Sequence, residues 1–174
     1  MRNDGWRIVI ITISKAPELE NDSIISTGFR CLKLIVSNYI DKLSQENFIT
    51  ILHAIGRYAG NDGDNINNNL TSVGMFQNIA DYTAKLSLQD PTATPFNTQR
   101  IWSILFEKTQ ELGGDYRAEI RRANIFTLEN ILMTHGQLLS DQVWSSILKL
   151  NLLGMLKNSL EMYASQRMGS GGPH

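Results

Sequence analysis

Asp115 and Arg121 are the residues of this chain whose types and spacing most clearly define an interaction. Asp115 follows two glycines in a tight turn, and the apolar–basic pair Ile120–Arg121 comes shortly after it. A carboxylate in such a turn accepts hydrogen bonds from its own backbone, and a nearby guanidinium forms a charge-assisted pair with it. We therefore expect Asp115, Ile120 and Arg121 to form a structural junction between helices. An ordinary helix start with Asp115 near its N-cap is the alternative.

The other reactive residue types form no recognisable catalytic or metal site. His53 lies inside an apolar helical pattern and is expected to be a partly buried packing residue, and His135 precedes a glycine at a helix end. Asp62 and Asp64 suggest a calcium loop, but the bidentate Glu that such a loop requires at its twelfth position is missing. Glycine-rich phosphate loops and nucleophile elbows are also missing. We expect no enzymatic activity, no cofactor and no metal site.

Cys31 is the single cysteine of the chain. One cysteine excludes an internal disulfide and any cysteine-based metal cluster. It lies in an apolar helical pattern with Phe29, Leu32 and Ile35, so we expect a buried, inert thiol.

These residues must be positioned by helices, because the apolar side chains recur at three- and four-residue spacing nearly throughout. Cap residues and glycines set the expected boundaries, and Ser44 and Ser140 are the clearest caps. The expected helices are 4–14, 21–43 (or from 23), 45–59, 67–87 (or from 69), 98–112, 117–135 and 141–163.

Seven helices joined mostly by short turns predict an all-α fold of antiparallel helix pairs. The stretch 112–123 is typical of the start of the second helix in a HEAT-type repeat. We therefore expect an armadillo/HEAT-like, right-handed α-solenoid, with a closed helical bundle as the alternative. Residues 1–168 should form one domain, an excerpt of a longer array, and residues 169–174 resemble an artificial expression tail.

Composition and charge narrow the class of protein. The hydrophobic fraction is 42% and the net charge is −1 over 174 residues, and the mean hydropathy is −0.18. These values are typical of a soluble globular domain and argue against the strongly basic surface of a nucleic-acid binder. The start of the chain has no cleavable signal, which favours the cytoplasm.

Two stretches together resemble a known family. Residues 67–81 are similar to the pattern N-x-S-L-T-A-[IV]-G-L-L-W-N-I-[SA]-D, with Gln77 where the pattern often has Trp. Residues 101–144 are similar to L-W-x-x-L-L, then D-x-R-x-E-[VI]-R, then [ST]-H-G-x-L-L-x-x-x-W. Both patterns are those of the Mon-two (monensin-sensitivity, Ysl-two) family, and the resemblance covers about residues 5–165, apart from an acidic, Asn-rich insertion at 62–65.

The resemblance implies an armadillo-like segment of a large scaffold that lies peripherally on trans-Golgi network and endosome membranes, on the cytoplasmic side. It also implies partners: a Dopey-type protein, a phospholipid flippase and an Arf-like GTPase. The alternative is the regulatory helical-repeat region of a large Arf guanine-nucleotide exchange factor whose catalytic domain lies outside this chain.

Two surfaces are candidates for binding. The first is the polar edge that carries Asn65, Asn67 and Asn69, where the alternative is that these residues only cap a helix. The second is a basic set that would face an anionic membrane, where the alternative is a salt-bridged ladder between repeats; its members are Arg117, Arg121, Arg122, Lys149 and Lys157. Asn78 and Asp81 share one helix face and predict a buried polar clamp to the adjacent repeat.

Overall fold

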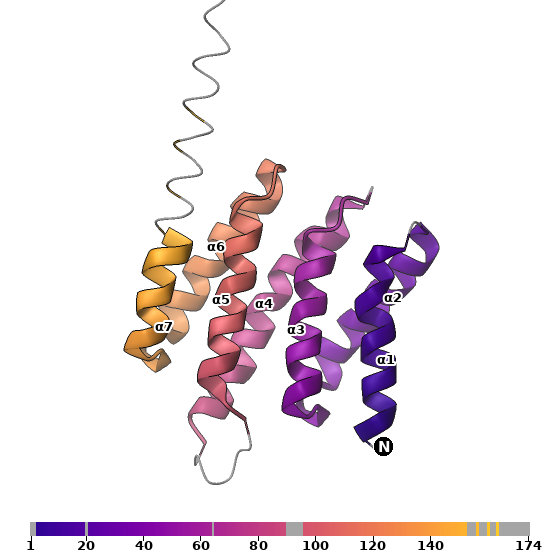
Figure 1. Cartoon of the computed structure of the whole chain (residues 1–174), viewed down its shortest axis with the longest axis horizontal. Coiled ribbons are helices and arrows are strands. Elements are labelled where there is room, and N and C mark those ends of the chain that lie inside the picture. Colours follow the sequence, from indigo (N-terminus) through magenta and orange to yellow (C-terminus); the bar gives the residue numbers. More distant parts are fainter. Residues whose placement is uncertain are drawn as a thin grey trace, which may run out of the picture.

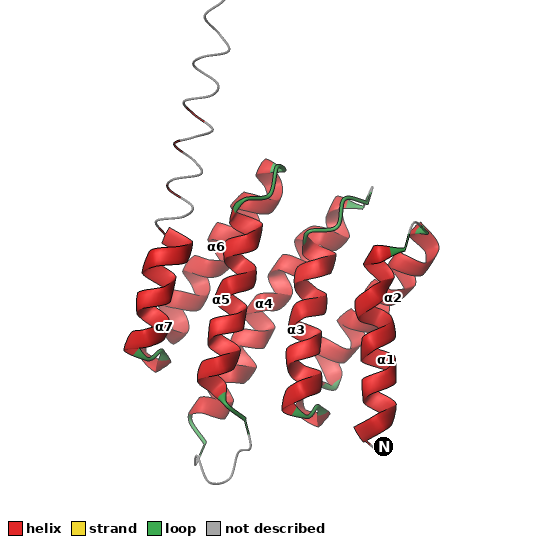
Figure 2. Cartoon of the chain, viewed as in Figure 1, coloured by secondary structure: helices red, strands yellow, loops and turns green. Residues whose placement is uncertain are grey.

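A computed structural model of the chain describes residues 3–19, 21–63, 65–89 and 96–152, together with Leu156, Leu160 and Tyr163. All regular secondary structure in these residues is helical (Figure 2). The α-helices are α1 (Asn3–Lys15), α2 (Asp22–Asn38), α3 (Gln45–Ala59), α4 (Ile66–Ser87), α5 (Thr98–Gly113), α6 (Ala118–His135) and α7 (Asp141–Ser146).

The helices form two layers. Helices α1, α3, α5 and α7 stand side by side in one layer, and α2, α4 and α6 lie behind them (Figure 1). Each helix of the front layer packs on the helix that follows it, and neighbours within each layer also touch. Because α1 and α7 lie at opposite ends of the stack, the bundle does not close. The predicted all-α, solenoid-like arrangement is confirmed.

Polar side chains fix where most of the helices begin. In each case the cap side chain accepts a hydrogen bond from the backbone N–H three residues on; the caps are Asn21, Ser44, Asn65, Asn97 and Ser140. The start of α4 was predicted one to three residues too late. Asn65, not Asn67 or Asn69, is its cap, and the helix begins at Ile66.

Two predicted helix ends also differ from the structure. Helix α2 ends at Asn38 because Tyr39 leaves the helical region (φ −131°, ψ 7°), and a short 3-10 turn, Ile40–Lys42, follows it. Helix α7 ends at Ser146 and continues as a π-helical stretch, Ile147–Leu152. Most of the remaining predicted helix, like the tail 169–174, lies outside the described residues.

The core runs between the two layers along the whole stack. Its largest fully buried side chains include Phe48 of α3, Phe76 of α4 and Trp102 of α5. Cys31 is not part of this core: the thiol is exposed, so the predicted buried position is wrong. Phe29, Leu32 and Ile35 do turn inward, whereas Cys31 lines an open groove between α1 and α2.

Candidate interaction edge

Three loops of the solenoid lie along one edge of the stack, the upper edge in Figure 1. They connect α1 to α2, α3 to α4 and α5 to α6, and we call their described residues together the loop edge (residues 16–19, 21, 60–63, 65 and 114–117). The predicted junction and the Asn-rich stretch both fall on this edge or directly beside it.

Asn61 ties the three loops together. Its side-chain Nδ2 donates to the carbonyl oxygen of Pro17 (3.0 Å) in the first loop. Its own carbonyl oxygen accepts hydrogen bonds from Arg117 Nη1 (2.8 Å) in the third loop and from Asn69 Nδ2 (2.9 Å) in α4. Consecutive repeats are thus linked through one residue of the middle loop.

The carboxylate of Asp115 is paired with Arg117. It accepts hydrogen bonds from the Arg117 backbone N–H (2.9 Å), from Nε (2.9 Å) and from Nη2 (2.8 Å). Both side chains are nearly buried, 8% exposed for Asp115 and 11% for Arg117. Burial by itself would raise the pKa of Asp115, but the hydrogen bonds and charge of Arg117 outweigh it and hold that pKa below its ordinary value.

Arg121 has a different role from the one expected. Its Nη1 donates to the backbone carbonyl oxygens of Asp115 (2.7 Å) and Tyr116 (2.8 Å), and not to the carboxylate. Ile120 is fully buried beside it. The structure therefore brings Asp115, Ile120 and Arg121 together where α6 begins, but the ion pair of this junction is made by Arg117. Arg117, expected as a partner-binding residue, has its guanidinium occupied inside the molecule because it sits two positions after the carboxylate.

Two buried asparagines make equivalent bonds in successive helix pairs. Asn69 of α4 donates from Nδ2 to the carbonyl oxygen of Tyr58 near the end of α3 (2.7 Å). Asn124 of α6 donates from Nδ2 to the carbonyl oxygen of Thr109 near the end of α5 (2.7 Å). We call these two places the Asn69 joint and the Asn124 joint. In both, the asparagine Oδ1 has no hydrogen-bond partner among the described residues. A polar residue inside an apolar helical stripe is the sequence signal for such a joint, and at Asn124 it was missed.

A polar cleft of about 340 Å³ opens beside the Asn69 joint. It lies between the N-terminal turns of α2 and α4 and the α3–α4 loop; its lining includes Asp22, Ser26, Tyr58, Asn61, Asn67 and Asn69. The candidate residues divide here: Asn65 and Asn67 are exposed, whereas Asn69 is only 3% exposed. Asn65 also serves as the cap of α4.

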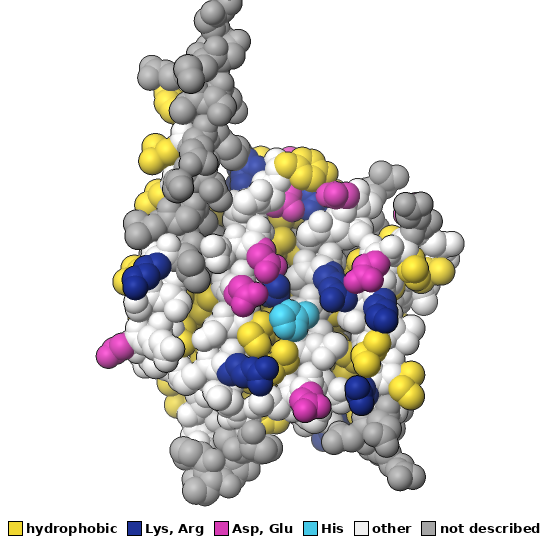
Figure 3. Space-filling view, viewed as in Figure 1, with side chains coloured by type: hydrophobic (Ala, Val, Ile, Leu, Met, Phe, Trp, Pro, Cys, Tyr) yellow, Lys and Arg dark blue, Asp and Glu magenta, His cyan; other side chains and the backbone are white. Residues whose placement is uncertain are grey.

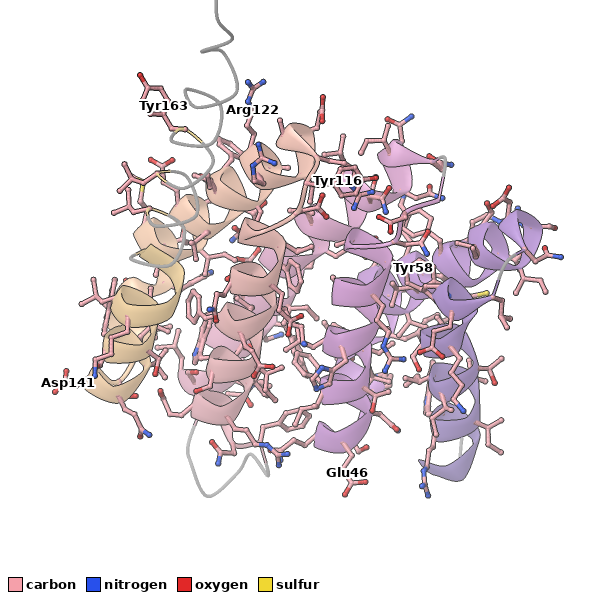
Figure 4. All side chains as sticks on the ribbon, turned by 45° about the horizontal axis from the view of Figure 1, so that its top comes forward. Glu46, Tyr58, Tyr116, Arg122, Asp141 and Tyr163 are labelled. Atoms are coloured by element: carbon pink, nitrogen blue, oxygen red, sulfur yellow. The ribbon has the colours of Figure 1, made fainter. Side chains whose placement is uncertain are left out.

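Tyr116 projects from the loop edge, and Arg122 projects from the N-terminal part of α6 that follows it (Figure 4). Tyr116 is 74% exposed, and its ring centroid lies 5.3 Å from the guanidinium carbon of Arg117. Arg122 is also exposed. Tyrosine and arginine are enriched among residues that dominate binding energies at protein interfaces. Tyr116 was missed in the sequence, where its position in a glycine-rich turn was the available signal.

The two stretches that carry the family resemblance meet in space. Asp81, the last residue of the first stretch, lies on α4, and its Oδ1 is 2.7 Å from Nε2 of His135 on α6. In the second stretch, Trp144 Nε1 donates to the Gly136 carbonyl oxygen (3.0 Å). The predicted clamp to the adjacent repeat is therefore made by Asp81 alone and at the surface, since Asp81 is 56% exposed and Asn78 is also exposed.

The predicted basic set is divided by the structure. Arg122 and Lys149 are exposed, Arg117 and Arg121 are engaged internally, and Lys157 lies outside the described residues. The face formed by α1, α3, α5 and α7 carries charges of both signs, mixed around a histidine (Figure 3). This face has no one-sign field of the kind that attracts a membrane or a nucleic acid.

Histidine, metal and membrane features add little to the site. His53 is half-buried, and burial together with the positive charge of Lys108 lowers its pKa. Within the described ranges, no group of three or more His, Cys, Asp or Glu side chains is placed to hold a metal ion; Asp64 of the calcium alternative lies outside those ranges. None of the described helices has the length and apolar character needed to span a bilayer.

Comparison with known proteins finds relatives of one kind. The chain is 24% identical over 169 residues to a protein named MON2 homolog from Drosophila melanogaster, covering 88% of this chain and 10% of the relative. It is 24% identical to the MON2 homolog of Xenopus laevis and 25% identical to that of Homo sapiens, covering 97% of this chain and 11% of each relative.

The chain therefore spans about a tenth of the length of these relatives. No protein-family model and no solved structure matches it. The relatives match over most of this chain, and the resemblance expected from residues 67–81 and 101–144 is confirmed. Most of the chain is thus similar to one segment of these MON2 homologues.

Proposed function

We propose that the chain is a non-catalytic scaffold segment of a peripheral Golgi and endosome protein. It mediates protein–protein interactions in endosome-to-Golgi vesicle transport and in Arf-like GTPase pathways. The observation that carries this proposal is the similarity of most of the chain to one segment of the MON2 homologues. The similarity to MON2 homologues also favours a scaffold over the regulatory region of an exchange factor.

The polar residues divide into a set that bonds inside the stack and a set that is exposed, and this division supports a binding role. Several buried or nearly buried polar side chains, those of Asp115, Arg117, Asn69 and Asn124, hold one helix or loop against another. The residues left exposed at the loop edge, Tyr116 among them, are of types that recur at protein interfaces. A stack held by its own polar residues and carrying such an edge suits a surface that binds proteins.

The proposed partners are a Dopey-type protein, a phospholipid flippase and an Arf-like GTPase. The proposed location is the cytoplasmic side of trans-Golgi network and endosome membranes, with peripheral attachment. Both proposals rest on the family resemblance, and the loop edge is the surface that we assign to the partners.

Pulldown of the Dopey-type protein and the GTPase with purified variants tests the assignment. Tyr116→Ala, Arg122→Ala and Asn67→Ala should each weaken capture, with Tyr116→Ala costing at least about tenfold in affinity. Glu46→Ala is the matched control, because Glu46 is exposed at the opposite end of α3 (Figure 4). If all three variants capture both partners as well as the unchanged chain does, the loop edge and the adjoining starts of α4 and α6 are not the binding surface.

A flotation experiment tests direct contact with a membrane. Vesicles with and without acidic lipid should be compared for the unchanged chain and for the double variant Arg122→Glu, Lys149→Glu. Binding through these exposed cations should rise with acidic lipid and fall in the variant. Binding without any dependence on acidic lipid would leave protein partners as the route to the membrane.

A further inference from the structure

An apolar groove of about 320 Å³ lies open between α1 and α2. Small and apolar side chains of the two helices and of the turn between them line it; they include Thr12, Ala16, Leu19, Ile24, Thr27 and Cys31. Leu19 is 48% exposed and Ile24 is 46% exposed. Exposed apolar side chains that gather along one groove mark an interaction surface.

The groove lies on the side of the pair α1–α2 that faces away from the rest of the stack. On α2, Asp22 and Ser26 line the polar cleft against α4, whereas Ile24 and Cys31 lie on the opposite side of the helix and line the groove. The pair α1–α2 stands at one end of the stack (Figure 1). The groove is therefore part of an end face of the solenoid.

The next pair shows what covers such a face. Helix α1 packs on α3, and α2 packs on both α3 and α4. Each repeat of a solenoid contacts its neighbours in the same way, so the open face of α1–α2 corresponds to the face of α3–α4 that α1 and α2 cover. A further helix pair is therefore the occupant that fits, and the relatives, of which this chain covers about a tenth, are long enough to supply it.

The two joints inside the stack share one direction of hydrogen bonding. At the first joint, Arg57 of α3 donates to the Ser14 carbonyl oxygen near the C-terminal end of α1 (2.9 Å). At the second, Arg117, directly before α6, donates to the Ala59 carbonyl oxygen at the C-terminal end of α3 (3.3 Å). Carbonyl groups at a helix C-terminus lack partners inside the helix and carry partial negative charge, so a cation of the following pair suits them.

Lys15 is the cation at the corresponding end of α1, where it is the last residue of the helix. It is exposed, and its ammonium group has no hydrogen bond or ion pair within the part of the chain that the structure describes. Thr12 and Ala16, which flank it on the helix and in the following turn, both line the groove. Lys15 is thus placed to donate to an incoming helix end as Arg57 and Arg117 do.

We propose that the groove binds a further helix pair, supplied by an upstream part of a longer natural form of this protein. Apolar side chains of that pair fill the groove. A carbonyl group at the C-terminal end of its first helix accepts a hydrogen bond from Lys15. This joint does not depend on the partners proposed for the loop edge.

Cys31 is the reporter for the proposed joint, since its thiol is exposed, lines the groove and is the single thiol of the chain. The rate at which N-ethylmaleimide modifies Cys31 is followed by peptide mass spectrometry. It is compared between the 174-residue chain and the natural gene product with its upstream sequence. We expect modification to be at least about tenfold slower in the longer chain, because the incoming helices cover the thiol.

Two substitutions test the groove and the lysine separately. Thr27→Arg places a long charged side chain in the groove, and the matched control Ser37→Arg places it at an exposed position of α2 outside the groove lining. Thr27→Arg should restore fast modification of Cys31 in the longer chain, and Ser37→Arg should not. Lys15→Gln should lower the urea midpoint of the longer chain and leave that of the 174-residue chain unchanged, whereas the exposed control Lys33→Gln should change neither.

Equal modification rates of Cys31 in the two chains would overturn the inference, as would a natural gene product that begins at Met1. Protection of Cys31 by vesicles of phosphatidylserine and phosphatidylcholine, without protection in the longer chain, would assign the groove to a membrane instead. The pulldowns of the proposed partners are scored separately. Loss of capture there with Cys31 protected in the longer chain would remove the proposed function and keep this joint.

Discussion

The Asn69 joint and the Asn124 joint share one hydrogen bond but differ in what surrounds it. At the Asn124 joint the loop before α6 carries the nearly buried Asp115–Arg117 ion pair. At the Asn69 joint the loop carries no such pair among its described residues, and a polar cleft lies open beside the asparagine. Both asparagines bond a carbonyl oxygen near the end of the preceding helix, at 2.7 Å.

Beside the Asn69 joint, helices α1, α2 and α3 approach one another closely. Tyr58 of α3 donates its hydroxyl to the Ile13 carbonyl oxygen of α1 (3.1 Å). Gly28 of α2 lies so close that a Cβ there would overlap the Tyr58 hydroxyl oxygen and come within 2.9 Å of Ala16 Cβ. The comparison teaches that the same asparagine bond can lie beside a nearly buried ion pair in one place and beside a steric fit of helices in another, and the two surroundings differ in sensitivity to pH and to side-chain size.

The largest effect is expected from Arg117→Ala. The change leaves the Asp115 carboxylate nearly buried without its partner and removes the bonds to Ala59 and Asn61. Breaking a buried pair in this way costs about 3–5 kcal/mol, measured as the free energy of unfolding in urea. Arg122→Ala, an exposed arginine on the same helix, should stay within about 0.5 kcal/mol of the unchanged chain. Equal losses in the two variants would contradict the role of the ion pair.

At acidic pH the unchanged chain and a variant with a neutral side chain in place of Asp115 should become equally stable. The folded-state pKa of Asp115 is lowered, so its contribution to stability is present above its unfolded pKa of about 3.9 and is lost as the pH falls through the folded value. The unchanged chain should therefore be more stable than Asp115→Asn at pH 7, and the two should converge below pH 4.

The matched control for this titration is Glu129→Gln, an exposed carboxylate in the middle of α6. Its effect should be small at every pH. A stability gap between the unchanged chain and Asp115→Asn that stays constant down to the lowest pH would show that the charge of Asp115 does not stabilise the fold.

Gly28→Ala tests the steric joint and should cost about 1–3 kcal/mol through overpacking. The double variant Gly28→Ala, Tyr58→Phe removes the hydroxyl that the new methyl group would overlap. It should lose less stability than the sum of the two single changes, as a thermal or urea double-mutant cycle would show. Strict additivity would place the cost of Gly28→Ala in some other contact.

The smallest expected effect is the difference in free energy of unfolding between Asn69→Ala and Asn124→Ala. Asn69→Ala removes hydrogen bonds to two carbonyl oxygens, those of Tyr58 and Asn61, whereas Asn124→Ala removes the hydrogen bond to the Thr109 carbonyl oxygen. We expect Asn69→Ala to destabilise more, by about 1 kcal/mol. If Asn124→Ala lowers the free energy of unfolding by as much or more, the burial of Asn124 contributes more to stability than the second hydrogen bond of Asn69 does.

Helix periodicity and cap chemistry predicted most of the fold. The starts at Asn21, Ser44 and Ser140 follow from local bonds that a short stretch of sequence contains. The end of α2 and the burial of Cys31 depend on which neighbours cover a helix face. Periodicity alone does not contain that information, because Cys31 falls between inward residues and open surface.

The candidate site was predictable only in part, for a related reason. The turn at Asp115 predicts a paired carboxylate. Arg117 and Arg121 both lie within reach of it, and only the folded backbone determines that Arg117 forms the ion pair. The Asp81–His135 contact joins residues far apart in sequence. The cleft beside Asn69 arises from the spacing of two helix starts, which no local pattern encodes.

The position of Asn61 has a mechanical consequence. Its side chain reaches back to Pro17 and its carbonyl oxygen receives Arg117, so a stretching load along the loop edge passes through the main chain of one residue. Removing the side chain would remove the bond to Pro17 and leave the bond from Arg117 intact. A load between the first two helix pairs would then fall on the bonds that α3 makes to α1, from Tyr58 to Ile13 and from Arg57 to Ser14.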